Sequence, residues 1–318
     1  MFTAVITLQS DSVVAPHKFA HQLETYVIAP ELREKDALVE IMRLSTGRLV
    51  KVEIRGRGTA DKPKLDLTVK SRVKLHGDMI EEVCNEISWY LGLTEDLKPF
   101  YLMSSKDPVM QAAISHQYGS KPKSSFPVFK TLIDCICAQN VVFKRLFSMM
   151  TAICDRFGDK LKLEGKEYSA FPSPDQLAEA PLDDLRACKV GYRDKIIKNV
   201  AQAIVNKGIA IERLNELSLE DAQRVLLGLP GVGPYTANLT LSLARRERTV
   251  IHLDTYVREV FRHFYFRNRA ASDDQIISFV NERWPGYQAT AIGYLTTHTD
   301  VWAENLGKKF RLKSWAGG

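Results

Sequence analysis

The chain has 318 residues, of which 45% are hydrophobic and 26% are charged, a composition typical of a soluble globular protein with two or three lobes. No stretch approaches a membrane span, and the five cysteines are too few and too scattered for a disulfide framework, which excludes the membrane and disulfide-rich classes. The net charge is +6, and residues 1–105 hold 14 Lys/Arg against 15 Asp/Glu, whereas the remainder holds 30 against 23. The positive excess therefore lies in the second part of the chain, as expected of a surface that faces phosphate.

The first hundred residues predict a small antiparallel sheet followed by a helix. β-Branched or alternating stretches, broken by Gly and Pro, predict strands over 3–8, 37–44, 48–55 and 64–73. From His76 to Leu91 the apolar residues recur at helical spacing, which predicts an amphipathic helix. We therefore expect an N-terminal domain of sheet plus helix over residues 1–105.

From about residue 106 onward the strand signals largely vanish. We expect an all-helical core of two lobes over residues 106–318, so that the whole chain is an α+β protein. Prolines stand at plausible helix starts and boundaries, and the predicted helices cover 107–116, 127–138, 140–157, 174–179, 181–188, 193–207, 218–228, 234–245, 254–266, 272–283 and 287–305.

The most specific pattern of the chain runs from Leu229 to Asp254. It starts with Leu-Pro-Gly-Val-Gly-Pro-Tyr-Thr at 229–236, between two predicted helices, and ends with Val-Ile-His-Leu-Asp at 250–254. The glycines permit a close approach of the main chain, and the unpaired amides that start the next helix suit a phosphate. An acidic residue one helix later can then face the part of the ligand that the phosphate contact has positioned. The pattern indicates DNA held by a hairpin over 228–235 and cut beside a carboxylate.

This combination resembles the helix-hairpin-helix DNA glycosylases, whose hairpin is followed by a Gly/Pro-rich strip and an essential Asp. Three further motifs stand in the order of the branch that holds 3-methyladenine DNA glycosylase II and 8-oxoguanine DNA glycosylase: Ile-Cys-Ala-Gln-Asn at 136–140, Phe-Pro-Ser-Pro at 171–174 and Val-Gly-Tyr-Arg at 190–193. The resemblance covers roughly residues 105–310. It implies an enzyme of base excision repair that flips a damaged base out of the duplex and hydrolyses its N-glycosidic bond.

Asp254 is the candidate catalytic residue. Departure of a base builds positive charge on the sugar, and a preorganised carboxylate stabilises that charge and positions the attacking water. The alternative interpretation, that Asp254 caps a helix starting at Thr255, is compatible with this role. Relatives that also cleave the DNA backbone carry a Lys directly after the Gly-x-Gly-x of the hairpin. Tyr235 holds that place here, which predicts a monofunctional enzyme without AP lyase activity.

The expected substrate is an alkylated purine, because such a base is cationic and is attracted to aromatic faces. We expect the base pocket to consist of Tyr235, Trp284, Tyr287, Ile292 and Thr296. Ile292 and Thr296 replace the Gln and Phe that the resemblance leads one to expect in an 8-oxoguanine glycosylase. Core packing is the alternative interpretation for Trp284.

The remaining contacts are implied by the resemblance. Gln139 or Asn140 is expected to fill the gap left by the flipped base, with Arg145 near the unpaired base. Tyr192 and Arg193 are expected to wedge the opposite strand, with a helix-end cap as the alternative for Tyr192. The hairpin residues expected to bind DNA are Gly231, Val232, Gly233, Tyr235 and Thr236. The backbone carbonyls of Leu227, Leu229 and Val232 are expected to hold a monovalent cation, Na⁺ or K⁺.

This chemistry requires no cofactor, and no four-cysteine iron–sulfur loop follows Asp254. We expect a monomer that acts on double-stranded DNA with a damaged base, contacts no membrane, and works in the cytoplasm at the nucleoid, or in the nucleus of a eukaryote. Two alternatives remain open. One is a glycosylase for an oxidised purine or hypoxanthine on the same scaffold. The other is a helix-hairpin-helix module that only binds DNA, which needs neither Asp254 nor a gap-filling element near Asn140.

Overall fold

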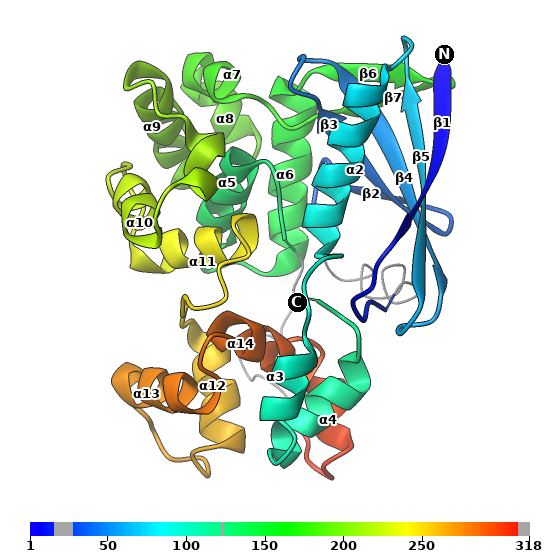
Figure 1. Ribbon diagram of the computed structural model, residues 1–318. Coiled ribbons are helices and arrows are strands. Elements are labelled where there is room, and N and C mark those ends of the chain that lie inside the picture. Colours follow the sequence, from blue (N-terminus) through cyan, green and yellow to red (C-terminus); the bar gives the residue numbers. More distant parts are fainter. Residues whose placement is uncertain (16–27, 122–123, 311–318) are drawn as a thin grey trace.

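The computed structural model describes residues 1–15, 28–121 and 124–310 and consists of a sheet layer and two helical lobes (Figure 1). The helices between residues 128 and 244 share one hydrophobic core, and we call them the hairpin lobe. Residues 97–117 and 254–310 share a second core, and we call them the terminal lobe. The predicted α+β architecture, a sheet followed by a mostly helical core, is confirmed.

The N-terminal sheet is antiparallel, with the strand order β1–β5–β4–β3–β2. Its buried face carries the alternating apolar residues of β4 and β5, which pack against helix α2 (Gly77–Leu91). A left-handed Gly92 ends α2, as is common for helix C-termini. The strands are β1 (Phe2–Gln9), β2 (Leu32–Glu34), β3 (Ala37–Arg43), β4 (Leu49–Gly58) and β5 (Pro63–Ser71). Four of them match the predicted strands, and only the three-residue β2 was not predicted.

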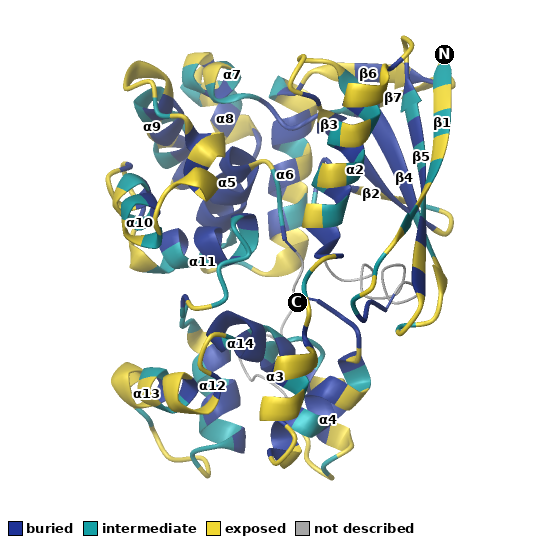
Figure 2. Cartoon of the chain, viewed as in Figure 1, coloured by how far each residue is buried: buried dark blue, intermediate teal, exposed yellow. Residues whose placement is uncertain are grey.

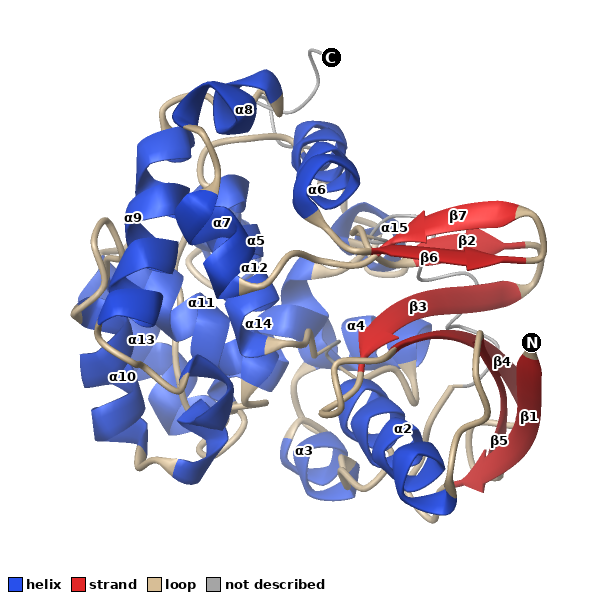
Figure 3. Ribbon diagram, turned by 90° about the horizontal axis from the view of Figure 1, so that it is seen from above, coloured by secondary structure: helices blue, strands red, loops and turns tan. Residues whose placement is uncertain are grey.

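Strand β3 is buried on both faces, because a second strand pair covers the face opposite α2 (Figure 3). Leu38 and Met42 point to α2, whereas Val39 and Ile41 pack against β6 (Lys160–Leu163) and β7 (Lys166–Ser169). The prediction of an all-helical core is therefore wrong at this place. The Lys-Leu-Lys-Leu sequence of β6 alternates over only four residues, and β3 supplies the apolar surface on which its leucines pack.

The hairpin lobe is organised around helix α5 (Val128–Ala138), whose residues 128–137 are all buried (Figure 2). The carboxylate of Glu212 accepts the amides of Val128 and Phe129, which satisfies part of the α5 N-terminus. The surrounding elements are α6 (Phe143–Phe157), α7 (Pro174–Glu179), α8 (Leu182–Ala187), α9 (Arg193–Asn206), the 3-10 helix η1 (Ile211–Glu216), α10 (Leu219–Leu227) and α11 (Pro234–Ala244).

The terminal lobe joins two distant parts of the chain. Its first part is α3 (Lys98–Met103) and α4 (Pro108–Gln117), and its second is α12 (Thr255–Phe264), α13 (Asp273–Arg283), α14 (Gln288–Thr296) and α15 (Thr299–Glu304). Because Leu97 and Phe100 belong to this core, the predicted division at residue 105 falls within the lobe. The single helix predicted over 287–305 is wrong, because it breaks where His298 adopts the left-handed conformation (φ 51°).

An ionic junction connects the sheet layer to the end of α11. The Glu95 carboxylate, which follows α2, pairs with Arg248 at 2.8 Å and also with Arg246. Arg246 further donates to the carbonyls of Trp89 and Tyr90 and, at 2.7 Å, to the Ser124 hydroxyl. Buried ion pairs of this kind are costly to break, so the junction fixes the sheet layer against the segment that leads to Asp254.

Candidate functional site

In the turn between α10 and α11 the glycines are exposed and the apolar residues are buried. Leu229 and Val232 are buried in the core of the hairpin lobe, whereas Gly231 and Gly233 are exposed. Gly231 has φ +76°, and a Cβ built there would lie 2.9 Å from Ile196 Cγ2, so both conformation and space favour glycine. Gly233 is the N-cap of α11 and provides no side-chain cap. The first amides of α11 therefore remain available to an external acceptor such as a phosphate.

Asp254 is the N-cap of α12. Its Oδ1 accepts the amide of Val257 at 2.7 Å, while in the part of the chain that the structure describes no donor bonds to Oδ2 and no cation pairs with the carboxylate. The segment before it is held by Asn238, whose side-chain amide donates to the Ile251 carbonyl at 3.0 Å. The cap thus holds one oxygen, and the other remains free for a reacting group.

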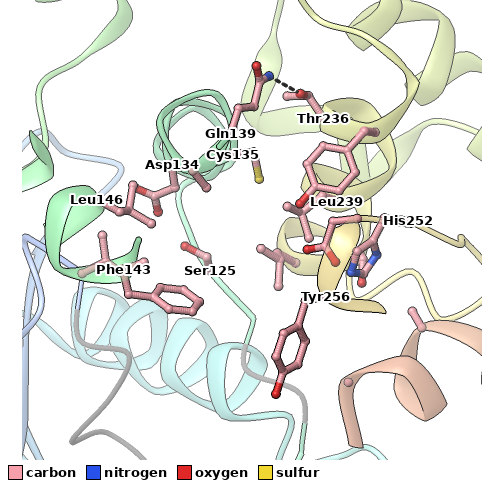
Figure 4. Close-up of a pocket in the computed structure, with 18 of the residues that line it drawn as sticks. Ser125, Asp134, Cys135, Gln139, Phe143, Leu146, Thr236, Leu239, His252 and Tyr256 are labelled. Atoms are coloured by element: carbon pink, nitrogen blue, oxygen red, sulfur yellow. Dashed lines mark hydrogen bonds between the residues drawn. The ribbon is translucent and has the colours of Figure 1, made fainter. Parts of the chain in front are cut away.

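A cleft of about 1090 Å³ lies beside Asp254 and is lined by residues of the sheet layer and both lobes. Figure 4 shows Asp134, Phe143 and Leu146 on one side of this cleft and Leu239, His252 and Tyr256 on the other. Tyr235 also lines it. A cleft with one unpaired carboxylate, aromatic side chains and an adjacent hairpin has room for a flipped nucleotide.

Tyr235 and His252 meet edge to face next to Asp254, with ring centroids 6.3 Å apart and an interplanar angle of 71°. Burial, together with the negative charge of Asp254, raises the pKa of the Tyr235 phenol, which therefore stays protonated. Burial lowers the pKa of His252, an effect that Asp254 only partly offsets. We call these three residues the Asp254 cluster.

The other residues predicted for the base pocket do not line the cleft. Trp284 and Ile292 are fully buried in the terminal lobe, Tyr287 packs against Phe100, and the Thr296 hydroxyl donates to the Ile292 carbonyl at 2.8 Å. The face of α14 that reaches the cleft carries Ala289, Gly293 and, just after the helix, Thr297. Ile292 and Thr296 are one residue out of register with this face, a rotation of about 100°.

The turn after α5 is held in place by hydrogen bonds of two side chains, those of Gln139 and Arg193. Gln139 Nε2 donates to Thr236 Oγ1 at 2.8 Å, which links the turn to the first residues of α11 (Figure 4). Asn140 follows with φ 53° and is exposed. Of the two residues predicted to fill the gap, Gln139 is therefore occupied, whereas the side chain of Asn140 bonds to none of the described residues.

Arg193 is not placed to wedge a DNA strand. Its side chain is buried, and the residue is only 3% exposed; its guanidinium donates to the carbonyls of Ile136 at 3.1 Å, Val190 at 3.2 Å and Gln139. It thus satisfies carbonyls at the C-terminus of α5, where a cation is also favoured by the helix dipole. Tyr192 is 61% exposed, with its ring over this guanidinium, and Arg145 is exposed and donates to the Lys189 carbonyl at 3.4 Å. Tyr192 and Arg145 therefore remain accessible to DNA.

Several cleft residues were not predicted, among them His252, Tyr256 and Phe143. His252 had a usable signal, because it stands only two residues before Asp254 in the sequence and both line the cleft. The buried ion pair of Lys130 and Asp134, with Nζ 2.8 Å from Oδ2, also lines the cleft and had no recognisable motif.

Within the described ranges, no helix is both long and apolar enough to pass through a bilayer. In the same ranges no three His, Cys, Asp or Glu side chains gather into a metal site.

Comparison with known proteins agrees with this geometry. Residues 133–286 match the family described as HhH-GPD superfamily base excision DNA repair protein. The chain is 26% identical over 220 residues to a DNA-3-methyladenine glycosylase of Bacillus subtilis, which covers 68% of this chain and 71% of the relative.

Two solved structures show the same fold. A 3-methyladenine DNA glycosylase from Archaeoglobus fulgidus superposes with a TM-score of 0.78 at 22% identity, covering 92% of this chain and 97% of the other. An 8-oxoguanine glycosylase/lyase from Clostridium acetobutylicum, solved with double-stranded DNA, superposes with a TM-score of 0.67 at 21% identity, covering 88% and 100%. The family match over residues 133–286 and the relatives at the level of sequence thus make this chain similar to the HhH-GPD superfamily of base excision DNA repair proteins.

Proposed function

We propose that the protein is a monofunctional DNA glycosylase that releases an alkylated purine and leaves an abasic site. The observation that carries this proposal is the free Oδ2 of Asp254 in a cleft beside a DNA-binding type of hairpin. The match of residues 133–286 to the HhH-GPD superfamily and the similarity to DNA-3-methyladenine glycosylase support it.

The mechanism begins with the phosphate contact. The exposed Gly231 and Gly233 and the first amides of α11 receive the DNA backbone, and Asn140 enters the gap left by the flipped base. The flipped nucleotide then occupies the cleft, with Tyr235 as one aromatic wall. As the N-glycosidic bond lengthens, positive charge grows on the sugar and Asp254 stabilises it. Water then adds to the sugar and loses a proton, for which Asp254 is the adjacent base.

Base release without strand cleavage follows from the chemistry of Tyr235. An AP lyase of this type needs an amine that forms an imine with the sugar, and a phenol cannot form one. Because burial keeps this phenol protonated, it is also a poor oxygen nucleophile. The absence of a lyase step is our proposal, since similar proteins include both glycosylases and glycosylase/lyases.

A monovalent cation is compatible with the hairpin. The backbone carbonyls of Leu227, Leu229 and Val232 are neutral oxygen donors of the kind that suit Na⁺ or K⁺. The Leu229 carbonyl accepts the Val232 amide at 3.2 Å, which leaves its second lone pair for a ligand. A cation held there supplies positive charge beside the phosphate and stiffens the turn.

The decisive test is free-base release from methylated duplex DNA, with the strand analysed before and after hot alkali. We expect release of 3-methyladenine and strand breaks that appear only after alkali. The Asp254→Asn variant keeps a good N-cap for α12, so it is expected to bind DNA normally and to lose release about a thousandfold. Asp300→Asn, which changes an exposed carboxylate in the first turn of α15, is the matched control and keeps full activity.

The outcomes separate the alternatives. Release of 8-oxoguanine or hypoxanthine in place of the methylated base would move the substrate to an oxidised or deaminated purine. Duplex binding that falls with salt, without release of any of these bases, would leave a module that only binds DNA. A flat salt dependence would contradict the assignment of the basic part of the chain to phosphate contact.

A further inference from the structure

The charge of the Asp254 cluster depends on His252, which has no role in the mechanism above. His252 and Asp254 both line the cleft, and the charge of Asp254 acts on the His252 ring. Its ring meets Tyr235 edge to face at 6.3 Å. Its Nδ1 atom is buried, and among the described residues nothing bonds to it.

This environment favours the neutral imidazole. A protonated imidazole carries N–H donors on both ring nitrogens, and a buried donor without an acceptor costs about 1–3 kcal/mol. With a bare, buried Nδ1, the proton of the neutral ring is placed on Nε2. Burial lowers the pKa of His252 in the same direction.

The groups around His252 leave Asp254 as the net charge of the cluster. Tyr235 on α11 is a protonated phenol, and Cys135 on α5, which acts on Tyr235, has its pKa raised by burial to about 12. Arg258 on α12 lines the cleft, but its guanidinium is held by Asp273 through two bonds of 2.8 and 2.9 Å. The cluster therefore has a net charge of −1 when His252 is neutral and zero when it is protonated.

We propose that His252 makes the charge selectivity of the Asp254 cluster depend on pH: while its ring is uncharged the cluster selects a cationic nucleoside or a cationic sugar in the cleft, and protonation of the ring cancels this preference. This inference rests on the proposed function, because it concerns the ligand of the same site. It identifies positive charge, carried by an alkylated purine or by the sugar in the transition state, as the property that the site recognises. The negative charge of the cluster does not strengthen the binding of a neutral purine or a neutral abasic sugar.

The size of the effect follows from the separation of the charges. A positive charge on His252 about 6 Å from a cationic ligand, at an effective dielectric near 20, weakens the binding of that ligand about a hundredfold. Screening in an open cleft reduces this to between about tenfold and a hundredfold. A neutral ligand of the same shape is unaffected to first order.

The test is the affinity of the full chain for two duplexes that differ only in charge at one position. One contains a pyrrolidine abasic analogue, which is cationic, and the other a tetrahydrofuran analogue, which is neutral. Both affinities are measured from about pH 8 to about pH 5, a range that stays above the ordinary carboxylate pKa and extends below the ordinary pKa of histidine, as the lowered pKa of His252 requires. We expect the preference of the wild-type protein for the cationic duplex to fall by about tenfold to a hundredfold toward acid pH.

The His252→Gln variant cannot titrate, so its preference should stay high and constant over the same range. His263→Gln is the matched control: it removes a histidine on α12 whose pKa burial also lowers but which does not line the cleft, and it should behave as the wild type. A preference that is constant in the wild type, or that still falls in His252→Gln, would overturn the inference. Release of 3-methyladenine by the same wild-type preparation is measured in parallel, so a failure of the proposed function is recognised separately.

Discussion

Replacing Arg193 by Met removes the guanidinium that holds the end of α5. The side chain is buried and donates to three backbone carbonyls, those of Ile136, Val190 and Gln139. No carboxylate among the described residues pairs with it, so its stabilisation comes from the carbonyls and the helix dipole. Methionine matches the unbranched apolar stem of arginine but lacks the guanidinium, so the substitution keeps the packing of the stem while it removes the hydrogen bonds.

The expected loss in the free energy of unfolding is about 3–5 kcal/mol. A hydrogen bond to a charged donor contributes about 1.5–3 kcal/mol, and each carbonyl that remains buried without a partner adds to the cost. The three bonds share one side chain and are not independent, which keeps the total below their sum. Arg193→Lys retains the charge but cannot reach three divergent acceptors, so it should cost about half as much.

The assay is urea denaturation followed by circular dichroism, with the slope m compared between variants. Arg186→Met is the matched control, because Arg186 is about half exposed, pairs with Asp183 and Asp194, and should lose no more than about 1 kcal/mol. Arg193→Lys should also release the base more slowly while binding undamaged duplex almost normally, since the Gln139–Asn140 turn loses its support. If Arg193→Met is no less stable than Arg186→Met, the assignment of Arg193 as a structural cap is refuted.

Three further predictions concern the hairpin, the sheet and the absent lyase step. Gly231→Ala should lower the free energy of unfolding by about 2–3 kcal/mol in thermal denaturation and weaken duplex binding. Gly286→Ala, also at positive φ but with open space around it, should lower it by only about 1 kcal/mol. Equal losses of stability in the two variants would contradict the clash with Ile196. Burial alone would raise the pKa of Glu53, but hydrogen bonds from Lys70 and Lys51 outweigh burial and lower this pKa to about 2. The stability that Glu53 contributes is therefore present above the ordinary pKa of a glutamate and is lost as the pH falls toward 2, which urea midpoints at acid pH will show. The Glu53→Gln variant should lack this part of the acid dependence. Tyr235→Lys should form DNA adducts that borohydride traps, and Thr255→Lys, an exposed neighbour in the same cleft, should not; adducts with neither variant would argue against the position assigned to Tyr235.

Local sequence signals predicted most of the fold because most elements are specified by their own residues. Helix α7 lies at the predicted residues 174–179, since Pro174 at its start and the capping box of Ser173 with Gln176 are local features. The pair β6–β7 was missed because its stability comes from β3, more than a hundred residues away. The break at His298 was missed because no Gly or Pro marks it, and the left-handed residue is a histidine.

The candidate site was predicted in part for the same reason. The hairpin, Asp254 and Tyr235 lie within one short segment, and the structure brings them to one cleft. Ile292 lies outside the cleft because an error of one residue in the register of a helix rotates the predicted face by about 100°. Arg193 was misread because a motif gives the identity of a side chain and not its burial. The sequence gives no sign that the guanidinium turns inward toward α5.

The composition of the terminal lobe has a consequence for the order of folding. Its core joins Phe100 and Met110 to Phe261 and Trp302, partners separated by roughly half of the chain, with the whole hairpin lobe between them. During synthesis from the N-terminus, the sheet layer and the hairpin lobe are complete before the partners of α3 and α4 exist. Such non-local contacts slow folding and leave apolar surface exposed in the meantime. The cleft is thus assembled last, when α12 and α14 dock, and a nascent chain that ends before residue 254 has neither the carboxylate nor the wall that encloses a base.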